Sequence, residues 1–376
     1  MPRSTEMFDR LIDHHCHGVT LAALDRAGFE ALMSEAHRPG SPAFVSQFDK
    51  PLGLVLRRHC APVLGLEPMA SPEAYLARRM ALGPTEASRR LLAAAGVSAM
   101  LIDSGHRADE ILDCAGMAEL AGVPSHEVVR IEAVFEAAAG QGDPLRAFAE
   151  TLAARAATAV ALKSVVAYRS GFAIEQTRPG AAELSVALAR WQRACEAGRV
   201  RLEDPVLLRH ALWVALELAA ERRLPIQLHV GVGDRDVVMP RCDPGWFVPF
   251  IEEAEARGVP VMLLHCHPFE RECAWMAEVW SNVHVDVGFT LNFTGPSALR
   301  PLRDLMEMAP FAKQLYSSDA FGLAELHLLG RVQFERALTR ILADWIAAGD
   351  LPLAEAERIA AMIAWENAAR VYELGQ

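Results

Sequence analysis

The stretch of this chain best suited to chemistry is Leu11-Ile12-Asp13-His14-His15-Cys16-His17-Gly18, an apolar start followed by an acid and three histidines. In a β-strand alternate side chains share a face, so His15 and His17 would project together while Cys16 projects away. Two imidazoles at this spacing can bind one Zn²⁺ or a similar divalent ion, provided other segments supply more ligands. The alternative is a polar N-terminal loop or an affinity-tag remnant.

Later apolar runs also end in polar residues that can bind metal or move protons. They are Asp103, Glu132, Lys163, His229, His265 and Asp319. Each has an ordinary reading too: His229 as a buried core histidine, and Asp319 as a helix N-cap. Because such residues recur in order at the ends of separate runs, the sequence favours a metal site whose ligands come from several strands.

Lys163 is the unusual member of this set, because an ammonium beside a divalent ion in an apolar interior would be repelled and poorly solvated. Reaction with CO₂ would turn it into an anionic oxygen ligand able to bridge two ions. The alternatives are a lysine that extends its charge to solvent, or one that binds an acidic substrate next to a single ion.

The elements that must position these residues alternate along the chain. Apolar runs of strand length lie at residues 11–16, 97–103, 128–134, 160–166, 225–230, 261–265, 283–287 and 314–318, with helical patterns between them. Regular alternation predicts parallel strands with right-handed crossovers, and eight units favour a (β/α)₈ TIM barrel over an open sheet. Residues 19–95 show helical but no strand-like patterns, which predicts a helical insertion after strand 1 that caps the barrel. We expect one domain over residues 1–376.

Composition narrows the class of protein. The net charge of −11, without a Lys/Arg cluster, argues against nucleic acid or anionic membranes as partners, and leaves a small-molecule substrate. No apolar run reaches the roughly 18 residues of a membrane helix and no signal-peptide pattern opens the chain, so we expect a cytoplasmic protein. The seven cysteines are scattered, which predicts reduced thiols. A homo-oligomer is compatible with the sequence.

The ordered pattern resembles the amidohydrolase superfamily. The segments Leu162-Lys163-Ser164-Val165-Val166-Ala167-Tyr168-Arg169-Ser170-Gly171, Gln227-Leu228-His229-Val230-Gly231-Val232-Gly233-Asp234, Leu264-His265-Cys266-His267-Pro268-Phe269 and Tyr316-Ser317-Ser318-Asp319 resemble its amidohydrolase-related branch, which includes the domain fused to glutamine-synthetase-like proteins. The resemblance implies that His15, His17 and Asp319 hold one metal ion and that His229 and His265 lie at or near a second. It also implies that Lys163, as its N-carboxylate, bridges the two.

These residues predict a metal-dependent hydrolase that cleaves an amide or ester bond of a small, acidic substrate. Asp319 and His265 are the candidate catalytic residues, because a carboxylate touching the metal and its water can accept and return a proton. Arg169, Glu132 and His267 are candidates for substrate binding, although Arg169 could equally form a salt bridge at the rim. The alternatives are a metal-dependent decarboxylase or sugar-acid isomerase on the same scaffold, and an inactive barrel that serves as a binding module.

Overall fold

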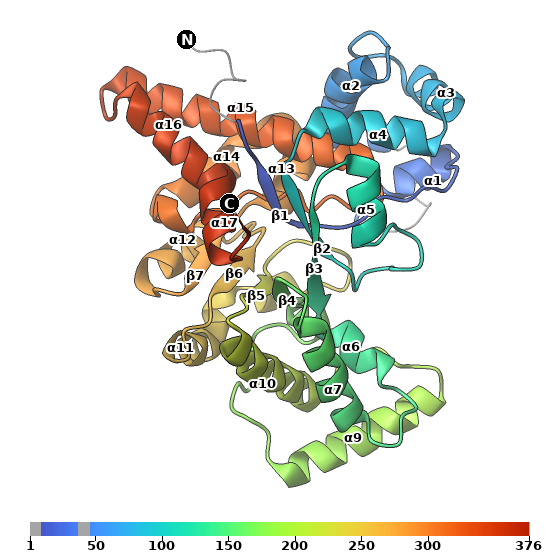
Figure 1. The fold of residues 1–376 in the computed structure, drawn as a ribbon, viewed down its shortest axis with the longest axis vertical. Helices are drawn as coiled ribbons and strands as arrows, with labels where there is room; N and C mark the ends of the chain where they lie inside the picture. Colours follow the sequence, from blue (N-terminus) through green and yellow to red (C-terminus); the bar gives the residue numbers. More distant parts are fainter. Residues whose placement is uncertain (1–8, 37–45, 376) are drawn as a thin grey trace.

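The centre of the computed structural model, which describes residues 9–36 and 46–375, is a sheet of parallel strands in the order β1 to β7 (Figure 1). The strands are β1 (Ile12–Cys16), β2 (Ala99–Asp103), β3 (Ser125–Arg130), β4 (Ala161–Ser164), β5 (Ile226–His229), β6 (Val261–Leu264) and β7 (Val283–Val285). Because every neighbouring pair is parallel, the carboxyl ends of all seven strands meet at one rim.

Helices connect the strands and cover the outer side of the sheet (Figure 1). They are α1 (Arg26–Ala31), α2 (Pro51–Val63), α3 (Pro72–Leu82), α4 (Pro84–Ala95), α5 (Cys114–Ala121), α6 (Ile131–Ala137), α7 (Pro144–Ala156), α8 (Val166–Arg169), α9 (Ala181–Glu196), α10 (Pro205–Arg222), α11 (Val248–Ala256), α12 (Glu270–Val279), α13 (Gly288–Thr294), α14 (Leu299–Met306), α15 (Ala324–Ala348), α16 (Leu353–Ala361) and α17 (Asn367–Val371). Several begin with proline after an aspartate or serine whose side chain caps the first turn, as Asp143 and Asp204 do.

Residues 314–320 span the gap between β7 and β1, where an eighth strand is predicted. Leu315 N donates to Val285 O of β7 at 3.0 Å, and His14 N of β1 donates to Tyr316 O at 3.1 Å. The segment does not form a regular strand, because its backbone turns into the left-handed region at Asp319, where φ is +47°. The prediction of parallel strands is therefore confirmed for seven of the eight runs.

Two layers of apolar side chains hold this arrangement together. The interior of the curled sheet is filled by residues such as Ile12, Leu101 and Met262, and Tyr372, just after α17, packs beneath them. A larger core lies between the sheet and the surrounding helices. Since the apolar filling occupies the amino-terminal half of the interior, the polar side chains of β1, β4 and β5 line its carboxyl-terminal half.

The third strand of the structure ends earlier than the sequence predicts. Residues 128–134 were expected to be extended, but β3 ends at Arg130 and α6 begins at Ile131. The apolar residues Ile131, Val134 and Phe135 recur at helical spacing and are buried, and this period overrides the β-branched composition. Glu132 therefore lies in the first turn of a helix and not at the end of a strand.

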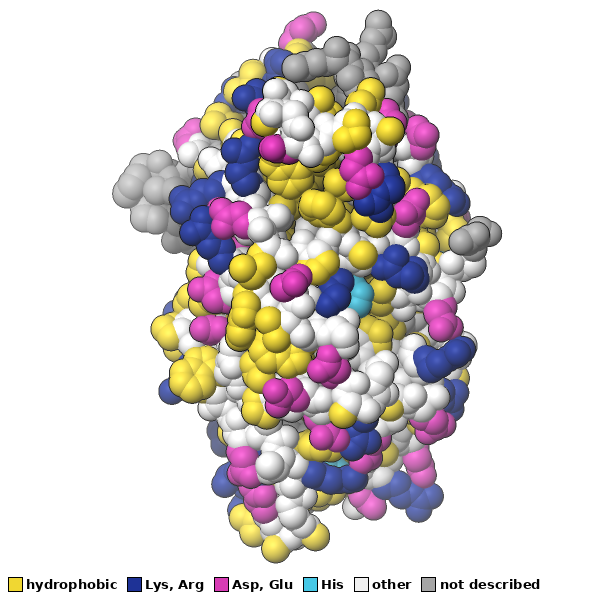
Figure 2. Space-filling view, turned by 90° about the vertical axis from the view of Figure 1, so that its left-hand side faces the viewer, with side chains coloured by type: hydrophobic (Ala, Val, Ile, Leu, Met, Phe, Trp, Pro, Cys, Tyr) yellow, Lys and Arg dark blue, Asp and Glu magenta, His cyan; other side chains and the backbone are white. Residues whose placement is uncertain are grey.

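The described part of residues 19–95 contains α1 to α4. Of these, α4 leads into β2 and lies along the long helix α15, while α2 packs against α13 and α15. On the face of the molecule shown in Figure 2, dark blue and magenta side chains are interspersed, so that face carries no patch of a single sign.

Candidate metal centre

The His-x-His pair faces the barrel interior, and not the outer face, because β1 contains an irregularity. Ile12 and Asp13 pair with Ala99 and Met100 of β2, but Cys16 pairs with Ile102, which is one residue short of a constant register. An extra residue of this kind is a β-bulge. It keeps His15 and His17 inside the barrel while Asp13 and Cys16 face outward.

Three histidines converge on the carboxylate of Asp319. His15 Nε2 lies 3.1 Å and His17 Nε2 lies 3.5 Å from Asp319 Oδ1, and His265 Nε2 lies 3.4 Å from Asp319 Oδ2. The three histidines are buried. One ligand atom from each of His15, His17 and Asp319 lies within 4.8 Å of the other two.

The outer hydrogen bonds fix which nitrogen of each imidazole faces the centre. His15 Nδ1 lies 2.8 Å from Gln227 Oε1, and the Gln227 amide nitrogen donates to His14 O, so the glutamine oxygen accepts from His15. His17 Nδ1 donates to Asp103 O at 3.1 Å. Both Nε2 atoms therefore direct lone pairs at an anionic oxygen, an arrangement that fits a divalent cation between them.

The electrostatics give these groups the protonation states of metal ligands. Burial and the nearby Lys163 lower the pKa of His15 to about 3. Burial alone would raise the pKa of Asp319, but the neighbouring imidazoles of His265, His15 and His17 hold that pKa well below its usual value. At neutral pH the imidazole of His15 is neutral and Asp319 is ionised, as metal binding requires.

The backbone of residues 318–319 is held by β1. Asp319 N donates to His15 O at 3.0 Å, and Asp13 accepts from Ser318 N at 2.9 Å and from Ser318 Oγ at 2.5 Å. A left-handed conformation is tolerated by aspartate better than by most residues. These contacts from Asp13 and His15 hold Asp319 in that conformation.

Lys163 and His229 complete the wall on the β4 and β5 side. Lys163 Nζ lies 3.3 Å from His15 Nε2, and burial lowers its pKa to about 8. His229 Nε2 donates to Val232 O at 2.8 Å, and its ring lies 4.9 Å from that of His265. Both side chains face the same space, but His229 does not belong to the group of ligand atoms around Asp319.

A cavity of about 130 Å³ opens over this centre and carries charges of both signs. Arg169 reaches it, with Nη2 at 3.2 Å from Glu136 Oε1, while its Nε and Nη1 are buried without a hydrogen-bond partner among the described residues. Arg130 forms two hydrogen bonds to Asp103 Oδ2 from Nε and Nη2. The lining residues are His15, His17, Glu35, His106, Arg130, Lys163, Val165, Tyr168, Arg169, Arg201, His229, Asp234, Asp319 and Phe321.

A family model for amidohydrolases matches residues 12–374, almost the whole chain. This chain belongs to the amidohydrolase family. The resemblance read from its motifs is thereby confirmed.

Individual relatives agree with this membership. The amidohydrolase chain is 30% identical over 225 residues to Protein fluG of Emericella nidulans, a match that covers 58% of this chain and 26% of that protein. A solved structure from Lactobacillus casei, described as a metal-dependent hydrolase, is 26% identical with a TM-score of 0.86 and covers 98% of this chain and 97% of its own. Glucuronate isomerase from Caulobacter crescentus is 16% identical with a TM-score of 0.67, covering 98% of this chain and 92% of its own, and shares the fold.

Two predicted site residues of this amidohydrolase do not line the cavity. Glu132 is buried behind the rim, where it accepts hydrogen bonds from Ser164 Oγ at 2.6 Å and Val165 N at 3.0 Å. His267 is 38% exposed at its side chain, and its Nδ1 lies 2.5 Å from Glu270 Oε1. Glu132 thus supports the turn after β4 that leads to Arg169.

Replacing Glu132 with Ala is expected to destabilise the protein by about 1 to 3 kcal/mol for each polar group that it leaves buried and unpaired. The groups affected are Ser164 Oγ and Val165 N. Urea unfolding of the metal-loaded protein measures the loss. Glu150→Ala on the exposed surface of α7 is the control, and an equal stability of the two variants would contradict the supporting role.

Some residues of the site were missed from the sequence. Gln227 lies two residues before His229 in β5, so strand alternation alone could have placed it beside the histidine. Glu35 lies in the predicted helical insertion, where no motif marks a site residue, and only the folded chain brings it to the cavity. No helix in the described part of the chain is long and apolar enough to span a membrane.

Proposed function

We propose that this amidohydrolase is a metal-dependent hydrolase that cleaves an amide or ester bond of a small substrate carrying a carboxylate. The observation that carries the proposal is the convergence of His15 Nε2 and His17 Nε2 on Asp319 Oδ1. Two nitrogens and one carboxylate oxygen, with open space beside them, are a donor set that suits Zn²⁺ in a catalytic site. A divalent ion bound there would supply Lewis-acid chemistry to a substrate carbonyl and to water.

Asp319 and His265 are the groups placed to move protons. Asp319 is ionised and can accept a proton from water, and its Oδ2 faces His265 Nε2 at 3.4 Å. His265 is in turn held by Asp286, which accepts from its backbone N at 2.9 Å and lies 3.7 Å from its Nδ1. A proton taken up at Asp319 can therefore be returned to the leaving group from the same oxygen.

Arg169 is the group that selects a carboxylate. A guanidinium binds two carboxylate oxygens at once, and two nitrogens of Arg169 are buried without a hydrogen-bond partner among the described residues. Glu35 and Asp234 line another part of the same cavity, and burial together with the charges of Asp319 and Asp234 raises the pKa of Glu35 to about 8. A substrate that presents a carboxylate to Arg169 and a hydroxyl or amino group to Glu35 matches both sides.

Replacing Arg169 with Gln is expected to raise KM for the carboxylate substrate about 10- to 100-fold, because it removes charge-assisted hydrogen bonds. Steady-state kinetics on the metal-loaded protein measures the effect, with kcat changed much less. Arg178→Gln, an exposed arginine paired with Glu217, is the control. An unchanged KM in Arg169→Gln would remove Arg169 from the substrate site.

A decarboxylase or sugar-acid isomerase is the second candidate. One observation that favours it is the presence of three arginines, Arg130, Arg169 and Arg201, in the lining of the cavity. The other is that one group of three metal-binding side chains lies close together in this cavity, which suits a single ion. These guanidiniums could hold a departing carboxylate or a sugar acid.

Turnover in H₂¹⁸O distinguishes the reactions. The metal-loaded protein is incubated with a panel of N-acyl amino acids, carboxylate esters and uronates, and the products are analysed by mass spectrometry. Hydrolysis is expected to place ¹⁸O in the carboxyl group of the new acid. Release of CO₂, or formation of a ketose without a labelled carboxyl group, would replace the hydrolase proposal with the second candidate.

A further inference from the structure

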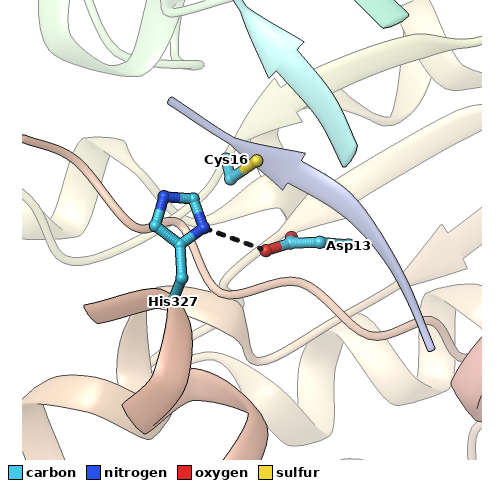
Figure 3. A group of neighbouring side chains, drawn as sticks. All are labelled: Asp13, Cys16 and His327. Atoms are coloured by element: carbon cyan, nitrogen blue, oxygen red, sulfur yellow. Dashed lines mark ion pairs between the residues drawn. The ribbon is translucent and has the colours of Figure 1, made fainter. Parts of the chain in front are cut away.

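A second group of metal-binding side chains lies on the outer face of β1, behind the centre described above. It consists of Asp13 and Cys16 from β1 and His327 from the first turn of α15, and Figure 3 shows His327 directed at Asp13 with Cys16 beside them. The group shares no residue with His15, His17 and Asp319. The β-bulge in β1 places Asp13 and Cys16 on this face together.

The three side chains are buried and form a compact donor set. One ligand atom from each lies within 4.8 Å of the other two, and His327 Nδ1 is 3.9 Å from Asp13 Oδ2. All three residues are fully buried. A separation of 3.9 Å is too long for a direct hydrogen bond, so His327 Nδ1 and Asp13 Oδ2 are close together without being bonded to each other.

His327 gives a second, independent indication. Its Nδ1 and Nε2 are buried, and within the described part of the chain neither forms a hydrogen bond of normal geometry, although the ring contacts the backbone of His17. Buried imidazoles almost always have a partner, because an unpaired polar group in the interior is costly. The ring is nevertheless held with Nδ1 directed at Asp13, as the dashed line in Figure 3 marks.

We propose that Asp13, Cys16 and His327 bind a divalent ion of the Zn²⁺ or Co²⁺ class at a structural site separate from the catalytic centre. On binding, the Cys16 thiol releases its proton to solvent and the thiolate donates an electron pair to the ion. The thiolate and the Asp13 carboxylate balance the two positive charges, and His327 binds as a neutral imidazole. Because the site is fully buried, the ion enters while the chain folds.

The bound ion would join β1 to α15 close to the catalytic carboxylate. Asp13 accepts both hydrogen bonds from Ser318, the residue before Asp319. An ion on Asp13 therefore fixes the carboxylate that holds the Ser318-Asp319 turn. The proposal concerns structure and metal content, so it does not depend on the reaction catalysed at the other centre.

Cobalt substitution tests the proposal, because only the site with Cys16 contains a thiolate. The full chain is unfolded, stripped of metal and refolded with Co²⁺, and its near-ultraviolet spectrum is recorded. A sulfur-to-cobalt charge-transfer band is expected in the wild type and in Asp319→Asn, and it should be absent in Cys16→Ser. Cys273→Ser, at another buried cysteine, is the matched control and should keep the band.

Metal analysis of His327→Gln gives a second measurement that does not depend on the folding of Cys16→Ser. It is expected to contain about one ion per chain less than the wild type, as loss of a ligand of a structural site predicts. A wild type without the charge-transfer band, or a band that survives in Cys16→Ser, would overturn the proposal. Equal metal content in His327→Gln and the wild type would do the same. Loss of turnover with the band intact would count against the hydrolase and not against this site.

Discussion

Replacing Asp319 with Asn is expected to reduce kcat by about 10²- to 10⁴-fold while most of the bound metal is retained. The amide can still offer an oxygen to the ion, since His15 and His17 remain in place, but it cannot accept a proton from water. The Asn side chain also suits the left-handed backbone at this position, where φ is +47°. Initial rates and metal analysis on the same preparation separate the two effects.

Asp113→Asn provides the matched control for this substitution. Asp113 is an exposed N-cap of α5 and accepts from Gly116 N, a role that asparagine also fills. This variant should keep the wild-type rate. A near-normal rate in Asp319→Asn would refute the proposed proton transfer. Loss of all metal from this variant would show that Asp319 acts as a metal ligand and would leave its role in proton transfer without support.

Replacing Lys163 with Ala is expected to remove one ion of the catalytic centre and to lower kcat by at least about 10- to 100-fold, the cost of losing a group that orients metal ligands. Lys163 Nζ lies 3.3 Å from His15 Nε2, within reach of a ligand position, and its pKa of about 8 leaves part of it neutral at physiological pH. Only a neutral amine reacts with CO₂. Short carboxylic acids added to the variant should restore part of the activity.

The control for Lys163 is Lys313→Ala, because Lys313 binds the carbonyl groups of Ala277 and Trp280 away from the centre. It should keep its full metal content. If Lys163→Ala also keeps its full metal content, the predicted carboxylated bridge between two ions is wrong, and Lys163 serves as a cationic group beside a single ion.

The positions of the ligands along the chain could be predicted because strand periodicity is local. Alternation in β1 places His15 and His17 together with Cys16 opposite, as the structure has them, and Lys163 and His229 face inward from β4 and β5. The same reasoning failed at Glu132, where a helical period begins inside an apolar run that also suits a strand. Short runs of this kind do not distinguish the two periods.

The sequence by itself determined that His15 and His17 share one face of β1 with Cys16 opposite, since alternation over a few residues depends only on neighbours in the chain. It also pointed to the family, through motifs in β1 and between residues 162 and 319, and the family model that matches residues 12–374 confirms this membership. Only the tertiary structure decided that Asp13, Cys16 and His327 meet on the outer face and that Glu35 reaches the cavity. It also decided that two nitrogens of Arg169 are buried without a partner in the described part of the chain. These features depend on a bulge in β1 and on packing between distant helices and loops, and such contacts have no local signature in the chain.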